Sequence, residues 1–212
     1  MTAALSPKAL EEGRVFFAQA CEFMRGAGTL DDILPTRLPE VAFAGRSNAG
    51  KSSLLNALVG RRALARVSNT PGRTRQINFF LLGSRLILAD LPGYGYARVS
   101  KDDSARWTEL VFSYLRGRPN LRRVVLLIDA RRGLLEHDIE VMELLDRAAV
   151  SYQLVLTKTD KLKPEELQEA EAKIAGEAVR HGAAHPEIVA TSSVSGEGIA
   201  ELRAALARLA HR

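Results

Sequence analysis

One octapeptide, Gly45–Ser52, constrains the fold of this chain more than any other feature. It reads Gly-Arg-Ser-Asn-Ala-Gly-Lys-Ser, and it separates a strand-like run, Val41–Ala44, from a helix-like run, Lys51–Val59. In this context the pattern predicts a phosphate-binding loop whose backbone N–H groups surround a polyphosphate. We expect Lys51 to reach the β- and γ-phosphates and Ser52 to ligate Mg²⁺, while the positive end of the helix dipole faces the same anion. The chain is therefore predicted to bind a nucleoside triphosphate.

The predicted contacts of this loop extend over its whole length and one residue beyond it. They are Gly45, Arg46, Ser47, Asn48, Ala49, Gly50, Lys51, Ser52 and Ser53.

Strand-like and helix-like segments alternate after the loop. The predicted strands are 41–44, 76–82, 85–89, 124–128, 152–156 and 188–190, and the predicted helices are 51–59, 102–115, 138–149, 164–180 and 199–209. Gly83-Ser84 makes a hairpin of the second and third strands. This pattern predicts a three-layer α/β P-loop NTPase fold. Its sheet is mostly parallel and six-stranded with one antiparallel edge strand, and helices lie on both faces.

The composition bounds the rest of the chain. With 212 residues and 46% hydrophobic content, we expect one well-buried core. We place a boundary near Leu38, between an N-terminal extension (1–37) and the main domain (38–212). Ser6-Pro7 begins a helix in the extension, whereas Val15–Phe17 is compatible with a strand or with that helix. The absence of a long apolar run predicts no membrane span, and a single cysteine, Cys21, favours a cytoplasmic location.

A net charge of +5 favours a polyanionic partner such as RNA, although a solvated arginine-rich surface explains it equally well. One cluster precedes a buried strand and would give salt-dependent RNA binding: Arg116, Arg118, Arg122 and Arg123. Three aromatic side chains could stack on bases, namely Tyr94, Tyr96 and Trp107, although core packing is the simpler role for Trp107.

A second phosphate-side motif follows the strand at 85–89. Its residues are Asp90, Leu91, Pro92 and Gly93. Asp90 can hold Mg²⁺ through a water molecule, and the N–H of Gly93 can meet the γ-phosphate. A simple turn after a strand is the alternative.

Two further segments predict the base. Thr157, Lys158, Thr159 and Asp160 end one strand, and Thr191, Ser192 and Ser193 end the last one. The carboxylate of Asp160 can accept two parallel hydrogen bonds from guanine, a donor pair that adenine lacks. We expect the stem of Lys158 to pack over the base and backbone N–H groups of 191–193 to meet the guanine O6.

The four motifs occur in an order that resembles the translation-factor-like GTPases, and their amino-acid sequences resemble those of the EngB (YihA/YsxC) family. The resemblance rests on 43–56, on Thr70-Pro71-Gly72-Arg73-Thr74-Arg75, on Asn78-Phe79-Phe80 and on 90–97, with Thr157 in place of the usual asparagine. It implies a Ras-like G domain and a GTPase with GTP or GDP as ligand. It also implies that the protein assists assembly of the large ribosomal subunit and supports cell division and septation.

The resemblance also implies a nucleotide-responsive loop. Its residues are Gly72, Arg73, Thr74, Arg75 and Gln76, and Thr74 ligates Mg²⁺ in the triphosphate state, with Thr70 as a rival. Lys51, Thr74 and Gly93 are the predicted catalytic residues.

Tyr94 stands where many GTPases carry a glutamine that orients the attacking water. We therefore predict that intrinsic GTP hydrolysis is slow and that an additional group completes the catalytic site. One candidate is K⁺ bound by Asn48, although Asn48 could equally only shape the loop. The other is a group supplied by the large ribosomal subunit. We expect a monomer. The rival functions are a small-molecule phosphotransferase and a scaffold at the division septum with a structural nucleotide.

Overall fold

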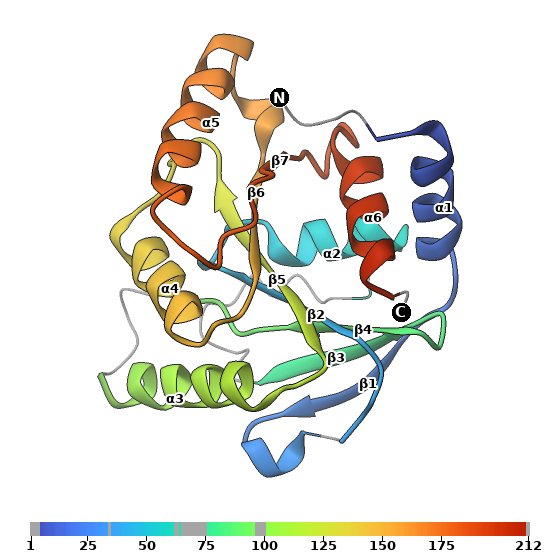
Figure 1. The fold of residues 1–212 in the computed structure, drawn as a ribbon, viewed down its shortest axis with the longest axis vertical. Helices are drawn as coiled ribbons and strands as arrows, with labels where there is room; N and C mark the ends of the chain where they lie inside the picture. Colours follow the sequence, from blue (N-terminus) through green and yellow to red (C-terminus); the bar gives the residue numbers. More distant parts are fainter. Residues whose placement is uncertain (1–4, 34, 62–63, 65–75, 96–100, 211–212) are drawn as a thin grey trace.

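A mixed β-sheet with helices on both faces forms the molecule in the computed structural model (Figure 1). The structure describes residues 5–33, 35–61, 64, 76–95 and 101–210, with the backbone alone for 101–108. The strands are β1 (Cys21–Ala27), β2 (Glu40–Gly45), β3 (Ile77–Leu82), β4 (Leu86–Asp90), β5 (Leu121–Asp129), β6 (Tyr152–Thr157) and β7 (Val189–Ala190). The α-helices are α1 (Pro7–Phe17), α2 (Lys51–Val59), α3 (Lys101–Gly117), α4 (Glu136–Arg147), α5 (Pro164–Ala178) and α6 (Ile199–Ala207). Short 3₁₀ turns are η1 (Leu30–Asp32), η2 (Thr159–Lys161) and η3 (Arg208–Ala210).

The strand order is β1-β3-β4-β2-β5-β6-β7. β3 pairs antiparallel with both β1 and β4, and the pairs β4–β2, β2–β5, β5–β6 and β6–β7 are parallel. The carboxyl ends of these parallel strands therefore meet at one edge of the sheet. In open α/β sheets this edge is where ligands bind.

Each face of the sheet has its own apolar core. Tyr114 of α3, Met142 of α4 and Ile174 of α5 belong to one core. Phe16 of α1, together with buried leucines of α2 and α6, belongs to the other. In Figure 1 α3, α4 and α5 accordingly lie on one side of the sheet, and α1, α2 and α6 on the other. The three-layer arrangement predicted from the sequence is confirmed.

The strand count is a correction, because the described residues contain seven strands where the sequence predicted six. The added strand, β1, occupies the edge, and the antiparallel β3 lies one position inside it. β1 buries Cys21 and Ala27 at its ends and leaves Phe23 and Met24 exposed. Such a strand lacks the alternation of apolar and polar residues by which a half-buried strand is recognised.

The first helix extends further than Ser6-Pro7 alone indicated. The Ser6 hydroxyl accepts the N–H of Ala9 at 3.3 Å, as an N-cap does, and α1 continues through Phe17. Of the two predictions for Val15–Phe17 the helix is correct, and Phe16 and Phe17 are buried against α6 and the sheet.

The boundary near Leu38 stays a prediction. In the structure α1 packs on α6, and β1 completes the same sheet as the later strands. None of the helices in the described part of the chain combines the length and the apolar character that a membrane span needs.

Candidate nucleotide-binding site

The predicted phosphate loop connects β2 to α2 at the carboxyl edge of the sheet. Two of its residues have positive φ, Asn48 at 63° and Gly50 at 95°, and Gly50 is the N-cap of α2. The Ala49 N–H donates to the Arg46 carbonyl at 2.9 Å, which closes a tight turn. The first turn of α2, with its unpaired N–H groups, thus directly follows the loop, as an anion site requires.

Lys51 and Asp90 meet beside this loop. Asp90 ends β4, its side chain is 7% exposed, and its carboxylate forms an ion pair with the Lys51 ammonium. Ser52 is the next residue of α2. A carboxylate and a hydroxyl are oxygen donors of the kind that Mg²⁺ prefers, so the residues present fit the predicted metal.

The segment after Asp90 lies directly on the phosphate loop. The Ser47 N–H donates to the Tyr94 carbonyl at 2.9 Å, and the Tyr94 N–H donates to the Gly45 carbonyl at 3.4 Å. A Cβ on Gly93 would lie 3.4 Å from the backbone of Ser47, so a glycine at this position permits the close approach. The structure therefore places Gly93, which follows Leu91 and Pro92, against the loop that should hold the phosphates.

The Tyr94 side chain is directed away from this contact, into the protein. Its hydroxyl donates to Oδ1 of Asp138 on α4 at 2.9 Å, and Oδ2 of Asp138 accepts the Leu135 N–H at 3.0 Å. Tyr94 is 7% and Asp138 2% exposed. Burial raises the pKa of both groups, and the neighbouring carboxylate raises the pKa of Tyr94 further. Asp138 was missed in the sequence because an aspartate in the first turn of a helix normally indicates only a cap.

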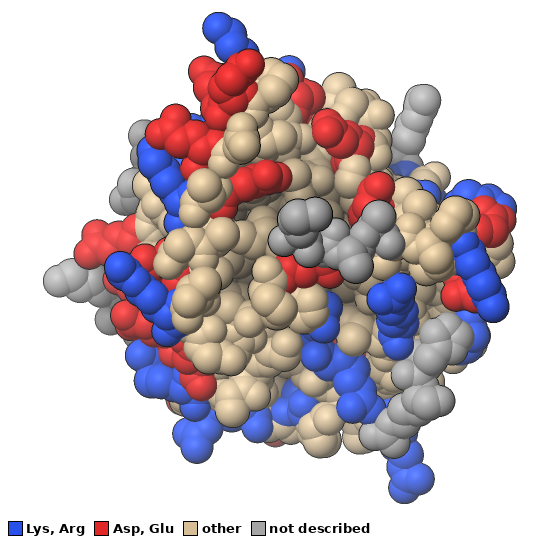
Figure 2. All heavy atoms as spheres, turned by 45° about the horizontal axis from the view of Figure 1, so that its top comes forward, with Lys and Arg blue, Asp and Glu red and all other residues tan. Residues whose placement is uncertain are grey.

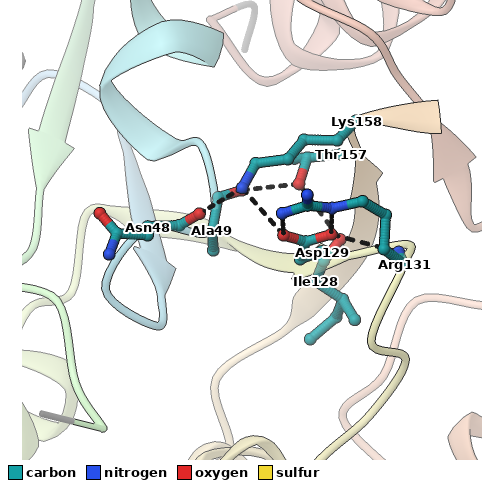
Figure 3. A network of polar contacts seen from close by, with 7 residues as sticks. All are labelled: Asn48, Ala49, Ile128, Asp129, Arg131, Thr157 and Lys158. Atoms are coloured by element: carbon teal, nitrogen blue, oxygen red, sulfur yellow. Dashed lines mark hydrogen bonds and ion pairs between the residues drawn. The ribbon is translucent and has the colours of Figure 1, made fainter. Parts of the chain in front are cut away.

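Two consecutive residues at the end of β6 bind the phosphate loop from the other side (Figure 3). The Thr157 hydroxyl donates to the Ala49 carbonyl at 2.6 Å, and the Lys158 ammonium donates to the Asn48 carbonyl at 2.6 Å. Thr157, which replaces the usual asparagine, thus still supplies a hydrogen bond. The phosphate loop and the predicted base loop are joined directly.

The predicted base-reading carboxylate is organised by the serine of the last loop. The Ser192 hydroxyl donates to Oδ1 of Asp160 at 2.7 Å and accepts the N–H groups of Val194 and Ser195, each at 3.1 Å. The hydrogen bond from Ser192 and the ammonium of Lys161 lower the pKa of Asp160. Asp160 is therefore a charged acceptor, as recognition of a paired donor requires.

The neighbours of this carboxylate lie in the same corner. The Thr159 N–H donates to the Thr191 carbonyl at 3.3 Å, and the Thr191 hydroxyl donates to the Leu156 carbonyl at 2.7 Å. Ser193, the third predicted residue of this loop, is exposed.

A small cavity of about 90 Å³ lies beside the phosphate loop. Arg46, Ser47 and Asn48 line it, together with Asp138, Lys158 and a further carboxylate, Asp129. Asp129 ends β5 and was also missed in the sequence, since no motif of the four includes it.

The predicted nucleotide-responsive loop falls largely outside the described residues. Gly72, Arg73, Thr74 and Arg75, with the rival Thr70, lie outside them, and so does Tyr96. The side chain of Trp107 is likewise not described. Gln76 is described, and its side chain lies beside Gly26 of β1.

The predicted arginine cluster is not a free surface. Arg118 donates to both carboxylate oxygens of the fully buried Glu40, and Arg123 donates to Gln153 at 3.0 Å. Burial lowers the pKa of Arg123. The prediction was wrong for these two arginines, because a buried carboxylate and a buried amide bind their guanidinium groups. Nor does Tyr94 have an exposed ring to stack on a base.

Comparison with known proteins decides the family. A family model described as 50S ribosome-binding GTPase matches residues 40–158, and one described as Elongation factor Tu GTP binding domain matches residues 114–212. A protein of Rhodospirillum rubrum named "Probable GTP-binding protein EngB" is 56% identical over 208 residues, which cover 96% of this chain and 90% of the relative. A protein of the same name in Granulibacter bethesdensis is 58% identical over 201 residues, or 95% and 90% of the two chains. This chain belongs to the EngB family of GTPases.

Solved structures agree with the EngB fold. A crystal structure of a probable GTP-binding protein engB has a TM-score of 0.63 at 23% identity and covers 81% of this chain and 98% of that one. The structure of Era in complex with MgGDPNP and a segment of 16S ribosomal RNA has a TM-score of 0.64 at 23% identity, over 82% of this chain and 57% of that one. The predicted fold and the predicted GTPase family are confirmed.

Proposed function

We propose that this EngB-type chain is a GTP-dependent switch with slow intrinsic turnover, and that a group from outside the chain completes hydrolysis. The observation that carries this proposal is the hydrogen bond of 2.9 Å from Tyr94 to Asp138. Where many GTPases present a glutamine to the attacking water, this phenol is directed toward α4. The side chain after Gly93 therefore does not orient a water molecule.

The nucleotide is proposed to bind along the carboxyl edge of the sheet. The loop at 45–53 would surround the phosphates with Lys51, and Asp160 would read guanine. Ser52 and Thr74 would ligate Mg²⁺, and Asp90 would hold it through a water molecule. Held by these residues, the metal would neutralise negative charge on the phosphates.

Asn48 is the proposed ligand for an activating K⁺. Asn48 is exposed, and Figure 3 shows its amide directed away from Lys158, which binds only its main-chain carbonyl. A cation beside the phosphates would offset charge that develops during hydrolysis. Turnover should be faster in KCl than in NaCl of equal ionic strength, and equal rates in the two salts would exclude this role.

The proposed partner is the large ribosomal subunit, through its rRNA. The name of the matching family model and the net charge of +5 support this proposal. Figure 2 shows Lys and Arg side chains predominating over the lower half of one face, whereas side chains of both signs lie over the upper half. A polyanion would meet the basic half. In this proposal the monomeric protein acts in the cytoplasm, and defects in cell division and septation follow its loss.

Two experiments test this function. Purified large-subunit particles should stimulate GTP hydrolysis by the wild-type protein and leave Lys51→Ala inactive. Depletion of the protein should lower the amount of mature large subunits in gradient fractionation. Normal subunit profiles after depletion, together with no stimulation at saturating particle concentration, would contradict the proposal.

A further inference from the structure

Asp129 occupies a central position between the phosphate loop and the base loop. It is the last residue of β5, its side chain is 9% exposed, and it belongs to none of the four nucleotide motifs. Its Oδ2 accepts the Lys158 ammonium at 2.8 Å. Its two oxygens also accept the Arg131 guanidinium at 2.9 and 2.7 Å (Figure 3). One carboxylate thus binds two cations of different loops.

The backbone of Lys158 has an unfavourable conformation, which neighbouring contacts must stabilise. Its φ is 60°, a left-handed conformation that non-glycine residues rarely adopt and that costs of order 1 kcal/mol. The position persists because the surroundings determine it. Thr157 is fixed to Ala49, and the Lys158 ammonium lies between the Asn48 carbonyl and the Asp129 carboxylate.

The carboxyl group of Asp129 is ionised at neutral pH. Burial alone would raise its pKa, but hydrogen bonds from Arg131 and Lys158 outweigh burial and hold the pKa well below the ordinary value of 3.8. Lys158 therefore always faces an ionised partner. Without Asp129 its ammonium would keep only the neutral Asn48 carbonyl and would lie near Arg131, a like charge.

We propose that Asp129 is a positioning residue for the guanine nucleotide, which acts through Lys158. It fixes the lysine stem that is predicted to pack over the base and, through the same ammonium, the Asn48 turn of the phosphate loop. The proposal rests on the nucleotide lying where the proposed function places it. Asp129 ends β5, which is separated by β2 from β4, the strand that ends at Asp90, so its effect should fall on nucleotide retention and not on hydrolysis.

The first test is the rate at which fluorescent GDP and GTP analogues leave Asp129→Asn, measured by stopped flow. Loss of one charge-assisted hydrogen bond to Lys158 should speed release of both nucleotides about tenfold. KM should rise while kcat at saturating GTP changes less than twofold. Equal loss of kcat, or unchanged release, would overturn the proposal.

The second test asks whether Asp129 acts through Lys158. If it does, Asp129→Asn combined with Lys158→Ala should release nucleotide no faster than Lys158→Ala alone. Additive effects would mean that Asp129 acts by another route and would overturn the proposal. Asp129→Glu, which retains the carboxylate, should restore slow release at least in part.

A matched control is Asp146→Asn. Like Asp129, which accepts the Arg131 N–H at 3.1 Å, Asp146 accepts a backbone N–H, that of Ala183 at 2.9 Å. Asp146 also lies 2.6 Å from Nδ1 of His181, and it belongs to the last turn of α4 and not to the loops of the predicted nucleotide site. This variant should lower thermal stability without changing nucleotide release. Failure of the wild-type protein to prefer GTP over ATP would contradict the proposed function itself, whereas a GTP-selective wild type with an unaffected Asp129→Asn would contradict only the role of Asp129.

Discussion

The phosphate loop is bound on two sides, and the two sides differ in kind. On the base side the hydroxyl of Thr157 in β6 and the ammonium of the following Lys158 donate to its carbonyls, and Asp129 supports Lys158 from β5. On the γ-phosphate side Asp90 forms an ion pair with Lys51, and Tyr94 contacts the loop through its backbone alone, with its side chain directed to Asp138. In the proposed function the base side fixes the nucleotide, and the γ-phosphate side leaves the attacking water to be oriented by another group.

The two carboxylates show the same contrast. Asp129 and Asp138 line one cavity. Asp129 is ionised between two cations, and its pKa is lowered, whereas Asp138 faces a phenol and a backbone N–H, and burial raises its pKa. The difference teaches that neighbouring cations favour the charged form of Asp129, whereas burial disfavours the charged form of Asp138.

The largest expected effect concerns the base side. Asp160→Asn replaces an acceptor with a donor opposite the guanine donors, and affinity for GTP should fall roughly a hundredfold, with a gain for xanthosine triphosphate. Competition binding with the two nucleotides measures this exchange. An unchanged preference for guanosine would show that Asp160 does not read the base.

A smaller effect is expected from Ser192→Ala. The variant removes the hydroxyl that orients Asp160 and accepts two backbone N–H groups, so affinity for GDP should fall roughly tenfold. Titration calorimetry with GDP measures it, and the neighbouring Ser193→Ala, on an exposed residue, is the control. Equal losses in both variants would argue against a specific role for Ser192.

Tyr94→Phe should separate stability from hydrolysis on the γ-phosphate side. Deleting the hydroxyl removes the hydrogen bond to Oδ1 of Asp138 and leaves that carboxylate only the Leu135 N–H as a donor among the described residues, which should cost about 1–2 kcal/mol in the free energy of unfolding. The single-turnover rate of GTP hydrolysis should change less than twofold. A tenfold loss of that rate with normal stability would mean that the phenol orients water after all.

The smallest effect is in the pH dependence of unfolding. The lowered pKa of Asp129 means that its stabilisation is present above 3.8 and is lost as the pH falls through its folded pKa. Asp138 has a raised pKa, so its contribution is present below 3.8 and is lost as the pH rises through its folded pKa.

Urea unfolding between about pH 3 and pH 7 measures both contributions. The stability difference between wild type and Asp129→Asn should shrink on acidification, and that between wild type and Asp138→Asn should grow. If both stability differences changed in the same direction on acidification, the predicted electrostatic contrast between Asp129 and Asp138 would be wrong.

Local sequence determined much of this protein. Gly50 with Lys51 and Ser52, read between a strand and a helix, sufficed for the phosphate loop, since its geometry depends on neighbouring residues. Asp160 with its flanking threonine and lysine was equally readable, because the motif lies at the end of a buried apolar strand. The alternation of such strands with amphipathic helices indicated the three layers.

Contacts between distant segments were decided only by the tertiary structure. Arg118 belongs to an arginine-rich stretch, but its guanidinium forms a buried ion pair with Glu40, which is far away in the chain. Asp129 and Asp138 are the same residue type and lie nine positions apart, yet Asp129 binds two cations and Asp138 accepts the hydroxyl of a tyrosine. β1 has no apolar periodicity, because an edge strand that is buried only at its ends needs none. A pattern along the chain carries information about neighbours, and it carries none about which distant group will share a buried charge.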